Sequence, residues 1–185
     1  MLLYRVFPYA ESAKAGRPGH PLYLNPLQGH GRWDNPEHYL AWYMASEEAA
    51  AVGEALGDIT PWDERMFAFP QVPGARRALG VYELPDDLPY LDLDDARQLV
   101  ELGVRPSQVV ERNRAFTQSL ALRIYRTGRY KGLRWWSYRH PQWRVWCLWE
   151  ITPTLVEVEE LSLEHPAVIA AAHTLNRALR DRHAR

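Results

Sequence analysis

The chain has 185 residues and a formal net charge of -1, and 46% of its residues are hydrophobic. A nearly neutral chain has no long-range field that would draw it onto nucleic acid or anionic lipid, so we expect no direct nucleic-acid binding. No segment approaches the roughly 18 uninterrupted apolar residues of a membrane-spanning helix, and we expect no membrane contact. The length suits one domain with an ordinary hydrophobic core, which we expect residues 1–185 to form.

Cysteine content and the N-terminal residues bear on the cellular compartment. Cys147 is the only cysteine, so no intrachain disulfide bond can form. It lies in an apolar run, which favours a buried, reduced thiol. The N-terminal residues lack the basic region, the long apolar core and the cleavage site of a signal peptide. We therefore expect a cytoplasmic protein.

The first elements include one long connection. Residues 2–7 predict a short strand that ends at Pro8, and residues 38–45 predict another strand. Between them, residues 9–30 form a polar loop rich in Gly, Pro and His. A loop of this length is typical of a functional lid or a disordered insert.

A helix is predicted next. Ser46 is a good N-cap, and Glu47 and Glu48 follow in the first turn, where the helix dipole favours carboxylates. We expect this helix to run to about Leu56 and to close at Gly57.

The rest of the chain mixes strands and helices without a regular β-α-β rhythm, which indicates an α+β fold. We expect strands at 64–69, 76–84, 89–93, 132–137, 142–151 and 154–161. We expect helices from Asp94 to before Gly103, over 107–127 and from 166 to about 182. The last helix and a frayed basic tail, Arg180 to Arg185, make up residues 166–185. Apolar side chains occupy both faces of the 142–151 segment, so this strand is expected to be central and covered on both sides.

Three chemically different residues, Arg32, Tyr43 and Glu54, are spaced eleven positions apart. A cation, an aromatic face and a carboxylate are what a protein needs to hold a dinucleotide and break a ribosyl bond. Arg5 ends the first strand, and Ser137 follows the predicted strand that begins at Gly132.

The segments that carry these residues resemble the RES-domain family, which is named after an arginine, a glutamate and a serine. The matching stretches are Leu3–Val6, Gly31–Pro36, Tyr43–Ser46 leading to Glu54, and Gly132–Ser137. The turn after Arg32 departs from the family, because it reads Asp-Asn-Pro-Glu where the family has Asn-Pro-Pro-Gly.

The resemblance implies a single domain similar to ADP-ribosyltransferase catalytic domains, with a mixed, split β-core flanked by helices. It implies NAD⁺ as substrate and no bound cofactor. RES-domain proteins are toxins of toxin–antitoxin pairs, and they cleave the nicotinamide–ribose bond by hydrolysis or phosphorolysis. An antitoxin protein is therefore an expected partner. The alternatives are a protein ADP-ribosyltransferase that uses the same site and a catalytically silent protein-binding module.

The resemblance also assigns roles. Glu54 is the candidate that stabilises positive charge on the ribose ring in the transition state. Arg32 and Arg5 are expected to hold the pyrophosphate, because a guanidinium binds phosphate oxygens in pairs. Tyr43 is expected to stack on nicotinamide, and Ser137 to bind the ribose or the carboxamide. Tyr4 is a further candidate contact.

Each of these residues also has an ordinary structural interpretation. Glu54 suits a solvated helix face, Arg32 a surface position against Trp33, and Arg5 an ion pair at a sheet edge. Tyr43 and Tyr4 suit core packing, and Ser137 suits a turn after a strand.

The match of the family's serine remains open, because Thr117, Gln118 and Ser119 offer another alignment. The seven histidines have no H-E-x-x-H spacing and one cysteine cannot build a thiolate site, so we expect no metal.

Overall fold

The computed structural model describes residues 1–180, and the end of the predicted basic tail lies outside them. The chain forms two compact units. The first comprises Met1–Tyr23, Ala45–Leu84 and the chain from Pro153 onward. The second comprises Leu24–Met44 and Pro85–Thr152.

An antiparallel ladder forms the sheet of the first unit. β1 (Leu2–Tyr9) pairs with β3 (Arg76–Glu83) along its whole length, and β3 pairs with β7 (Thr154–Glu160). Ala45, the last residue of β2 (Trp42–Ala45), lies opposite Tyr4. The strand order is therefore β2-β1-β3-β7.

Pro8 does not end β1, as the sequence had suggested. The strand continues to Tyr9, and Pro8 lies opposite Arg77 of β3. The pairing with β2 is centred on Tyr4, so at Pro8 the strand lies beyond that partner. A proline is compatible with a strand where its missing N–H faces away from the ladder.

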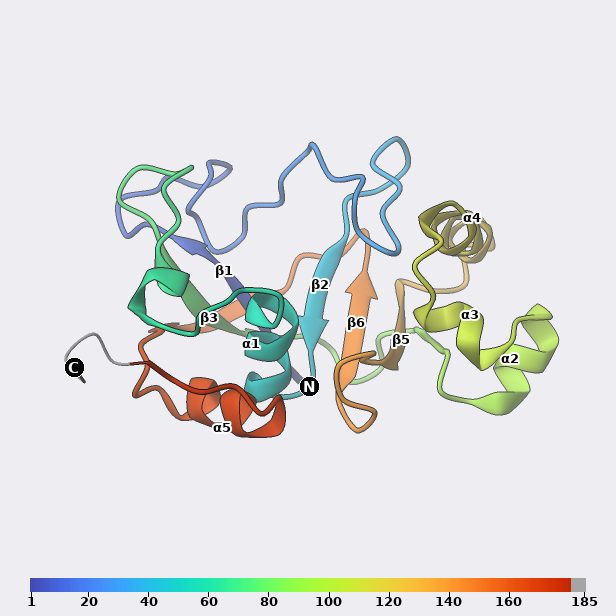
Figure 1. Cartoon of the computed structure of the whole chain (residues 1–185). Coiled ribbons are helices and arrows are strands. Elements are labelled where there is room, and N and C mark those ends of the chain that lie inside the picture. The colour runs from blue at the N-terminus through green and yellow to red at the C-terminus, as the bar shows by residue number, and fades with distance from the viewer. Residues whose placement is uncertain (181–185) are drawn as a thin grey trace. The chain divides into compact units, whose positions relative to one another are not determined.

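Two helices of small buried residues lie side by side in the first unit (Figure 1). α1 (Glu48–Leu56) packs on β1 and on α5 (Pro166–Thr174). The side chains that allow this close approach are Ala50, Ala51, Val52, Ala167, Val168, Ala171 and Ala172. α1 begins two residues after Ser46, and the N-cap is Glu47, which has an extended backbone.

Two other predictions in this unit were wrong. Residues 64–69 do not form a strand, because Asp63 accepts a hydrogen bond from the backbone of Arg65 and starts a 3₁₀-helix, η1 (Glu64–Phe67). α5 ends at Thr174, well before residue 182, because Asn176 adopts a left-handed conformation with φ of 51°. The amide of Arg177 then donates to the carbonyl of Ala172, which is the bond that closes a Schellman motif.

The second unit has a mixed sheet. β4 (Leu91–Asp92) runs parallel to β5 (Gly132–Trp136), β5 pairs antiparallel with β6 (Arg144–Leu148), and β6 is followed by β2. β6 thus lies between two strands, and Val145 to Leu148 are buried. The expectation of a central strand covered on both faces is confirmed, and so is the buried thiol of Cys147.

Three helices accompany this sheet: α2 (Ala96–Leu102), α3 (Pro106–Val110) and α4 (Arg114–Tyr125). The single helix expected over 107–127 is therefore divided. The division follows from Asn113, whose side chain accepts a hydrogen bond from the amide of Phe116 and caps a new helix. α2 is capped by Asp95, one residue later than expected, and ends at Gly103 with φ of 67°.

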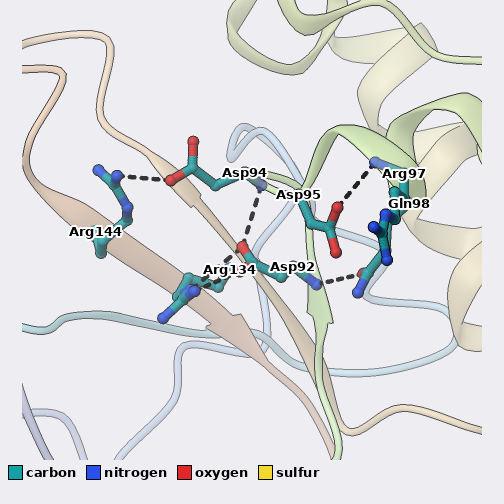
Figure 2. Close-up of polar contacts among 7 residues, drawn as sticks. All are labelled: Asp92, Asp94, Asp95, Arg97, Gln98, Arg134 and Arg144. Atoms are coloured by element: carbon teal, nitrogen blue, oxygen red, sulfur yellow. Dashed lines mark hydrogen bonds and ion pairs between the residues drawn. The ribbon is translucent and has the colours of Figure 1, made fainter.

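Two ion pairs link β5 and β6 to β4 and the residues that follow it (Figure 2). Arg134 of β5 pairs with Asp92 of β4, and Arg144 of β6 pairs with Asp94 at 2.6 Å. The Arg134 guanidinium carbon also lies 5.3 Å from the ring centroid of Tyr90. These contacts attach the short β4 to the sheet just before α2 begins.

The two units together confirm an α+β fold with a mixed β-core flanked by helices. Within residues 1–180, no helix is long and apolar enough to cross a membrane. The expectation of a single domain stays a prediction.

Candidate functional site

Arg32 lies in a tight turn that is organised by a buried carboxylate. Asp34 is 5% exposed, and its Oδ2 accepts hydrogen bonds from the amides of Gly29 at 2.8 Å and Gly31 at 2.6 Å. Its Oδ1 accepts the hydroxyl of Tyr43 at 2.7 Å. The same hydroxyl accepts the amide N–H of Trp33 at 2.9 Å. One acid and one phenol therefore hold the backbone before and after Arg32.

α4 supports this turn from another direction. Nε2 of Gln118 donates to the carbonyls of Gly29 and Gly31 at 3.0 and 2.9 Å. Nδ2 of Asn35 donates in turn to the carbonyl of Gln118 at 3.0 Å. The turn is thus connected to a helix that lies more than 80 residues away in the sequence.

Gly31 fits its place because it has no side chain. A Cβ atom there would lie 2.5 Å from both Oδ1 of Asp34 and the hydroxyl of Tyr43. Real Cβ atoms essentially never come so close to another heavy atom. The acid and the phenol can therefore meet only beside a glycine.

The guanidinium of Arg32 lies at the C-terminal end of α3. Its Nη1 donates to the carbonyl of Val109 at 3.2 Å and to that of Glu111. Carbonyls at a helix C-terminus attract a cation, since several of them have no partner within the helix. Trp33, beside Arg32, is fully buried and meets Trp135 edge to face.

Tyr43 is held through its hydroxyl. Burial raises the pKa of Tyr43 well above its ordinary value, and the nearby Cys147 and Asp34 raise it further. The phenol therefore keeps its proton and acts as the donor to Asp34. Burial also raises the pKa of the Cys147 thiol, and the negative charge of Asp34 adds to this, so the thiol stays neutral.

Ser137 lies directly after β5, in the turn that leads to β6. It is 2% exposed, its amide donates to the carbonyl of Trp143 at 2.9 Å, and its Oγ accepts the amide of Arg139 at 2.9 Å. The alternative residues on α4 differ. Thr117 is buried and bonds back to carbonyls of its own helix, and Ser119 is exposed.

In the first unit, Arg5 lies on the same face of β1 as the buried Leu3 and Phe7. Its Nη1 donates to the carbonyl of Tyr23 at 3.4 Å. Burial lowers the pKa of Arg5, and the Tyr82 hydroxyl, which is hydrogen-bonded to it, opposes that shift. These are the contacts that the structure gives Arg5, and its expected role in holding the pyrophosphate stays a prediction.

Tyr82 is a neighbour of Arg5 that the sequence did not single out. Burial raises the pKa of Tyr82 to about 12, so the phenol is neutral. Its hydroxyl donates to the carbonyl of Pro21 at 2.9 Å. The ring lies across Gly80, which faces Arg5 on the neighbouring strand. Arg5 and Tyr82 thus hold residues 21–23 of the predicted 9–30 loop against the sheet.

Glu54 lies in the last turns of α1 and is half-buried, beside the buried Gly53. Tyr4 lies on the opposite face of β1 from Arg5, and burial raises its pKa. The carboxylates of Glu48 and Glu159 raise the pKa of Tyr4 further. Tyr4, Arg5 and Glu54 therefore belong to the first unit, and Arg32, Tyr43 and Ser137 to the second.

Tyr43 belongs to a hydrogen-bonded network that holds the residues on either side of Arg32, and Asp34 and Gln118 were not predicted as its members. Asp34 gave a weak signal, as a carboxylate directly after Arg32 and Trp33. Gln118 was noted only as part of the alternative serine alignment. Among residues 1–180, no cluster of three His, Cys, Asp or Glu side chains is placed to hold a metal ion.

Comparisons with known proteins identify a family from the sequence and a similar fold among solved structures. A sequence model of the RES domain matches residues 2–170. A chain in the crystal structure of the M. tuberculosis MbcT–MbcA toxin–antitoxin complex superposes with a TM-score of 0.58. The alignment covers 95% of this chain and 88% of that chain, at 14% identity. Comparison with curated protein sequences found no significant match.

Proposed function

This chain belongs to the RES domain family, and on that premise we propose that it is a toxin that degrades NAD⁺ by cleaving the nicotinamide–ribose bond. The observation that carries the proposal is the family match over residues 2–170, which contains all six candidate residues. The acceptor in the proposed reaction is water or inorganic phosphate.

Cleavage of the nicotinamide–ribose bond requires a carboxylate near the ribose but no general acid. The nicotinamide ring of NAD⁺ carries a positive charge, and it leaves as the neutral amide once the electrons of the ribosyl bond move onto its nitrogen. The ribose ring then carries the positive charge, as in glycoside cleavage. We assign Glu54 to stabilise that charge, because a fixed carboxylate acts most strongly where charge develops. Its half-buried position on α1 supports this assignment, since burial strengthens such an interaction.

The remaining candidates are assigned to binding. Arg5 and Arg32 are proposed to hold the pyrophosphate, and Tyr43 and Tyr4 to contact the nicotinamide side of the substrate. Ser137 is proposed to bind the ribose or the carboxamide. The support for Arg32 is its fixed backbone, which is held on both sides by Asp34 and Tyr43.

An antitoxin is the proposed protein partner. The support is the fold, because the similar solved chain comes from a toxin–antitoxin complex. The proposed compartment is the cytoplasm, where NAD⁺ is abundant and where an unpaired toxin would act.

The test is product analysis with purified protein and NAD⁺, in buffers with and without inorganic phosphate. Release of nicotinamide with free ADP-ribose supports hydrolysis, and release with phosphorylated ADP-ribose supports phosphorolysis. Transfer of labelled ADP-ribose to protein would replace the proposal with a protein ADP-ribosyltransferase. Absence of both cleavage and NAD⁺ binding would point to a silent protein-binding module.

A further inference from the structure

We propose that Asp34 and Tyr43 are positioning residues that fix the direction of Arg32, and that Tyr43 does so through its hydroxyl group. This inference rests on the proposed function for its kinetic consequence. It concerns a role separate from any contact that the Tyr43 ring makes with nicotinamide.

Hydrogen bonds hold the backbone on both sides of Arg32. The amide of Gly31, before Arg32, donates to Asp34, and the amide of Trp33, after it, donates to the Tyr43 hydroxyl. The bond between Tyr43 and Asp34 joins these two anchors at 2.7 Å. Neither anchor can move without disturbing the other.

Water cannot replace the hydrogen bonds that Asp34 and Tyr43 make, because the Asp34 carboxylate is buried. Asp34 is 5% exposed, so its carboxylate depends on its three protein donors, the two glycine amides and the phenol. A buried charge that loses a donor has a large desolvation cost and tends to draw the surrounding backbone into a new arrangement. Burial keeps the proton on Tyr43, so this donor is present throughout the ordinary pH range.

The guanidinium of Arg32 is also held at its tip. Nη1 of Arg32 meets the carbonyls of Val109 and Glu111 at the end of α3, so its direction is defined at both the backbone and the tip. A shift of the turn would be transmitted to the tip. A guanidinium that is displaced from its ligand binds the ground state and the transition state more weakly alike, which appears as a rise in KM with little change in kcat.

The experiment compares Tyr43→Phe and Asp34→Asn with a matched control, Tyr125→Phe. Tyr125 donates to Glu150 at 2.7 Å, the same length as the Tyr43–Asp34 bond, but this bond is exposed and lies outside the turn. Each variant is made in the wild-type chain and in Arg32→Ala. The measurements are kcat and KM for NAD⁺, and the affinity for ADP-ribose by calorimetry, with melting temperatures as a check of folding.

We expect Tyr43→Phe and Asp34→Asn to raise KM and to weaken ADP-ribose binding by about tenfold, with kcat changed by less than about threefold. In Arg32→Ala, neither substitution should cause any further loss, because both act through the same guanidinium. Tyr125→Phe should match the wild type. If Tyr43→Phe also matches it, the hydroxyl has no such role. If its loss is the same in Arg32→Ala, it does not act through Arg32, and the inference is wrong.

A wild-type protein that neither cleaves NAD⁺ nor binds ADP-ribose would contradict the proposed function but would still allow a decision on this inference. In that case the Nε–Hε cross-peak of Arg32 is followed by NMR. A shift in Tyr43→Phe and none in Tyr125→Phe would support positioning by the hydroxyl. An unchanged cross-peak in both variants would overturn it.

Discussion

The hydroxyl of Tyr43 lies 2.7 Å from Oδ1 of Asp34, and it accepts the amide of Trp33 at the same time. Two residues nine positions apart thereby fix the backbone on both sides of Arg32. The sequence indicated Tyr43 as an aromatic ring, whereas the structure shows that its polar end is the part with defined partners.

Gly31 should tolerate no side chain. In Gly31→Ala the new methyl group would meet Asp34 and Tyr43 at 2.5 Å, so we expect a loss of about 1–3 kcal/mol in the free energy of unfolding. NAD⁺ turnover should fall as well, because the turn that carries Arg32 must shift. Chemical denaturation and an NAD⁺ assay on the same preparation would measure both effects.

Gly29→Ala is the matched control for that prediction. Gly29 also donates its amide to Asp34, but a Cβ atom there would meet nothing within 4 Å. We expect its stability to lie within about 1 kcal/mol of the wild type. Equal losses in the two variants would show that the contact with Asp34 and Tyr43 does not limit the turn.

The thiol of Cys147 should be unreactive in the folded protein. It is fully buried, and its pKa is raised by burial, so very little thiolate is present. A thiol reagent such as DTNB should label the native chain at the rate of unfolding and the denatured chain at once. Rapid labelling of the native chain would contradict the buried position.

The same thiol should make stability fall in alkaline solution. In the unfolded chain Cys147 releases its proton near pH 8.5, whereas in the folded chain it keeps the proton to a higher pH. Because the unfolded state then binds fewer protons, the free energy of unfolding decreases by up to about 1.4 kcal/mol per pH unit above about pH 8.5. Denaturation of wild type and Cys147→Ala between pH 8 and 9.5 would measure the difference in slope, and parallel curves would contradict it.

Much of the sheet could be predicted from local pattern. The β6 residues are apolar on both faces, and this pattern predicted a central strand around Cys147, as observed. The strand at 76–84 and the helix near Glu54 also followed from periodicity and flanking residues. These elements could be predicted because the apolar residues that indicate each of them lie close together in the sequence.

The wrong predictions share a different cause. The end of β1 was misplaced because the compatibility of Pro8 depends on which strand edge it occupies, and the sequence does not reveal this. The prediction of one helix over 107–127 was wrong because Asn113 caps a new helix at a position where the sequence pattern shows no break. The last helix was extended because a left-handed Asn176 is a weaker signal than glycine.

The candidate site was predicted only in part for the same reason. Arg32 and Tyr43 were identified by the family motif, but their connection through Asp34 is a tertiary contact. Gln118 reaches the turn across 87 residues of sequence, so no local spacing could have revealed it. The substrate-binding and catalytic roles assigned to all six residues, Tyr4, Arg5, Arg32, Tyr43, Glu54 and Ser137, stay predictions.

Arg134 should stabilise the second unit more than Arg144 does. Arg134 pairs with Asp92 and lies against the rings of Tyr90 and Trp146, whereas Arg144 pairs with Asp94 at a more exposed position. We expect Arg134→Met to lower the free energy of unfolding by about 1–2 kcal/mol. Arg144→Met should cost only about 0.5 kcal/mol. Urea denaturation would rank the two variants, and an equal or reversed ranking would show that the rings add nothing.

The most direct test of a Glu54-dependent site that cleaves NAD⁺ is the initial rate of nicotinamide release by wild type, Glu54→Gln and Glu47→Gln. Glu47 lies at the exposed start of the same helix and serves as the control. We predict that Glu54→Gln lowers the rate by at least about 100-fold, which is the size of effect expected for removing one charge-stabilising group. Glu47→Gln should retain the wild-type rate. Nicotinamide release that is equally fast in Glu54→Gln and wild type, with both proteins folded, would contradict a Glu54-dependent site.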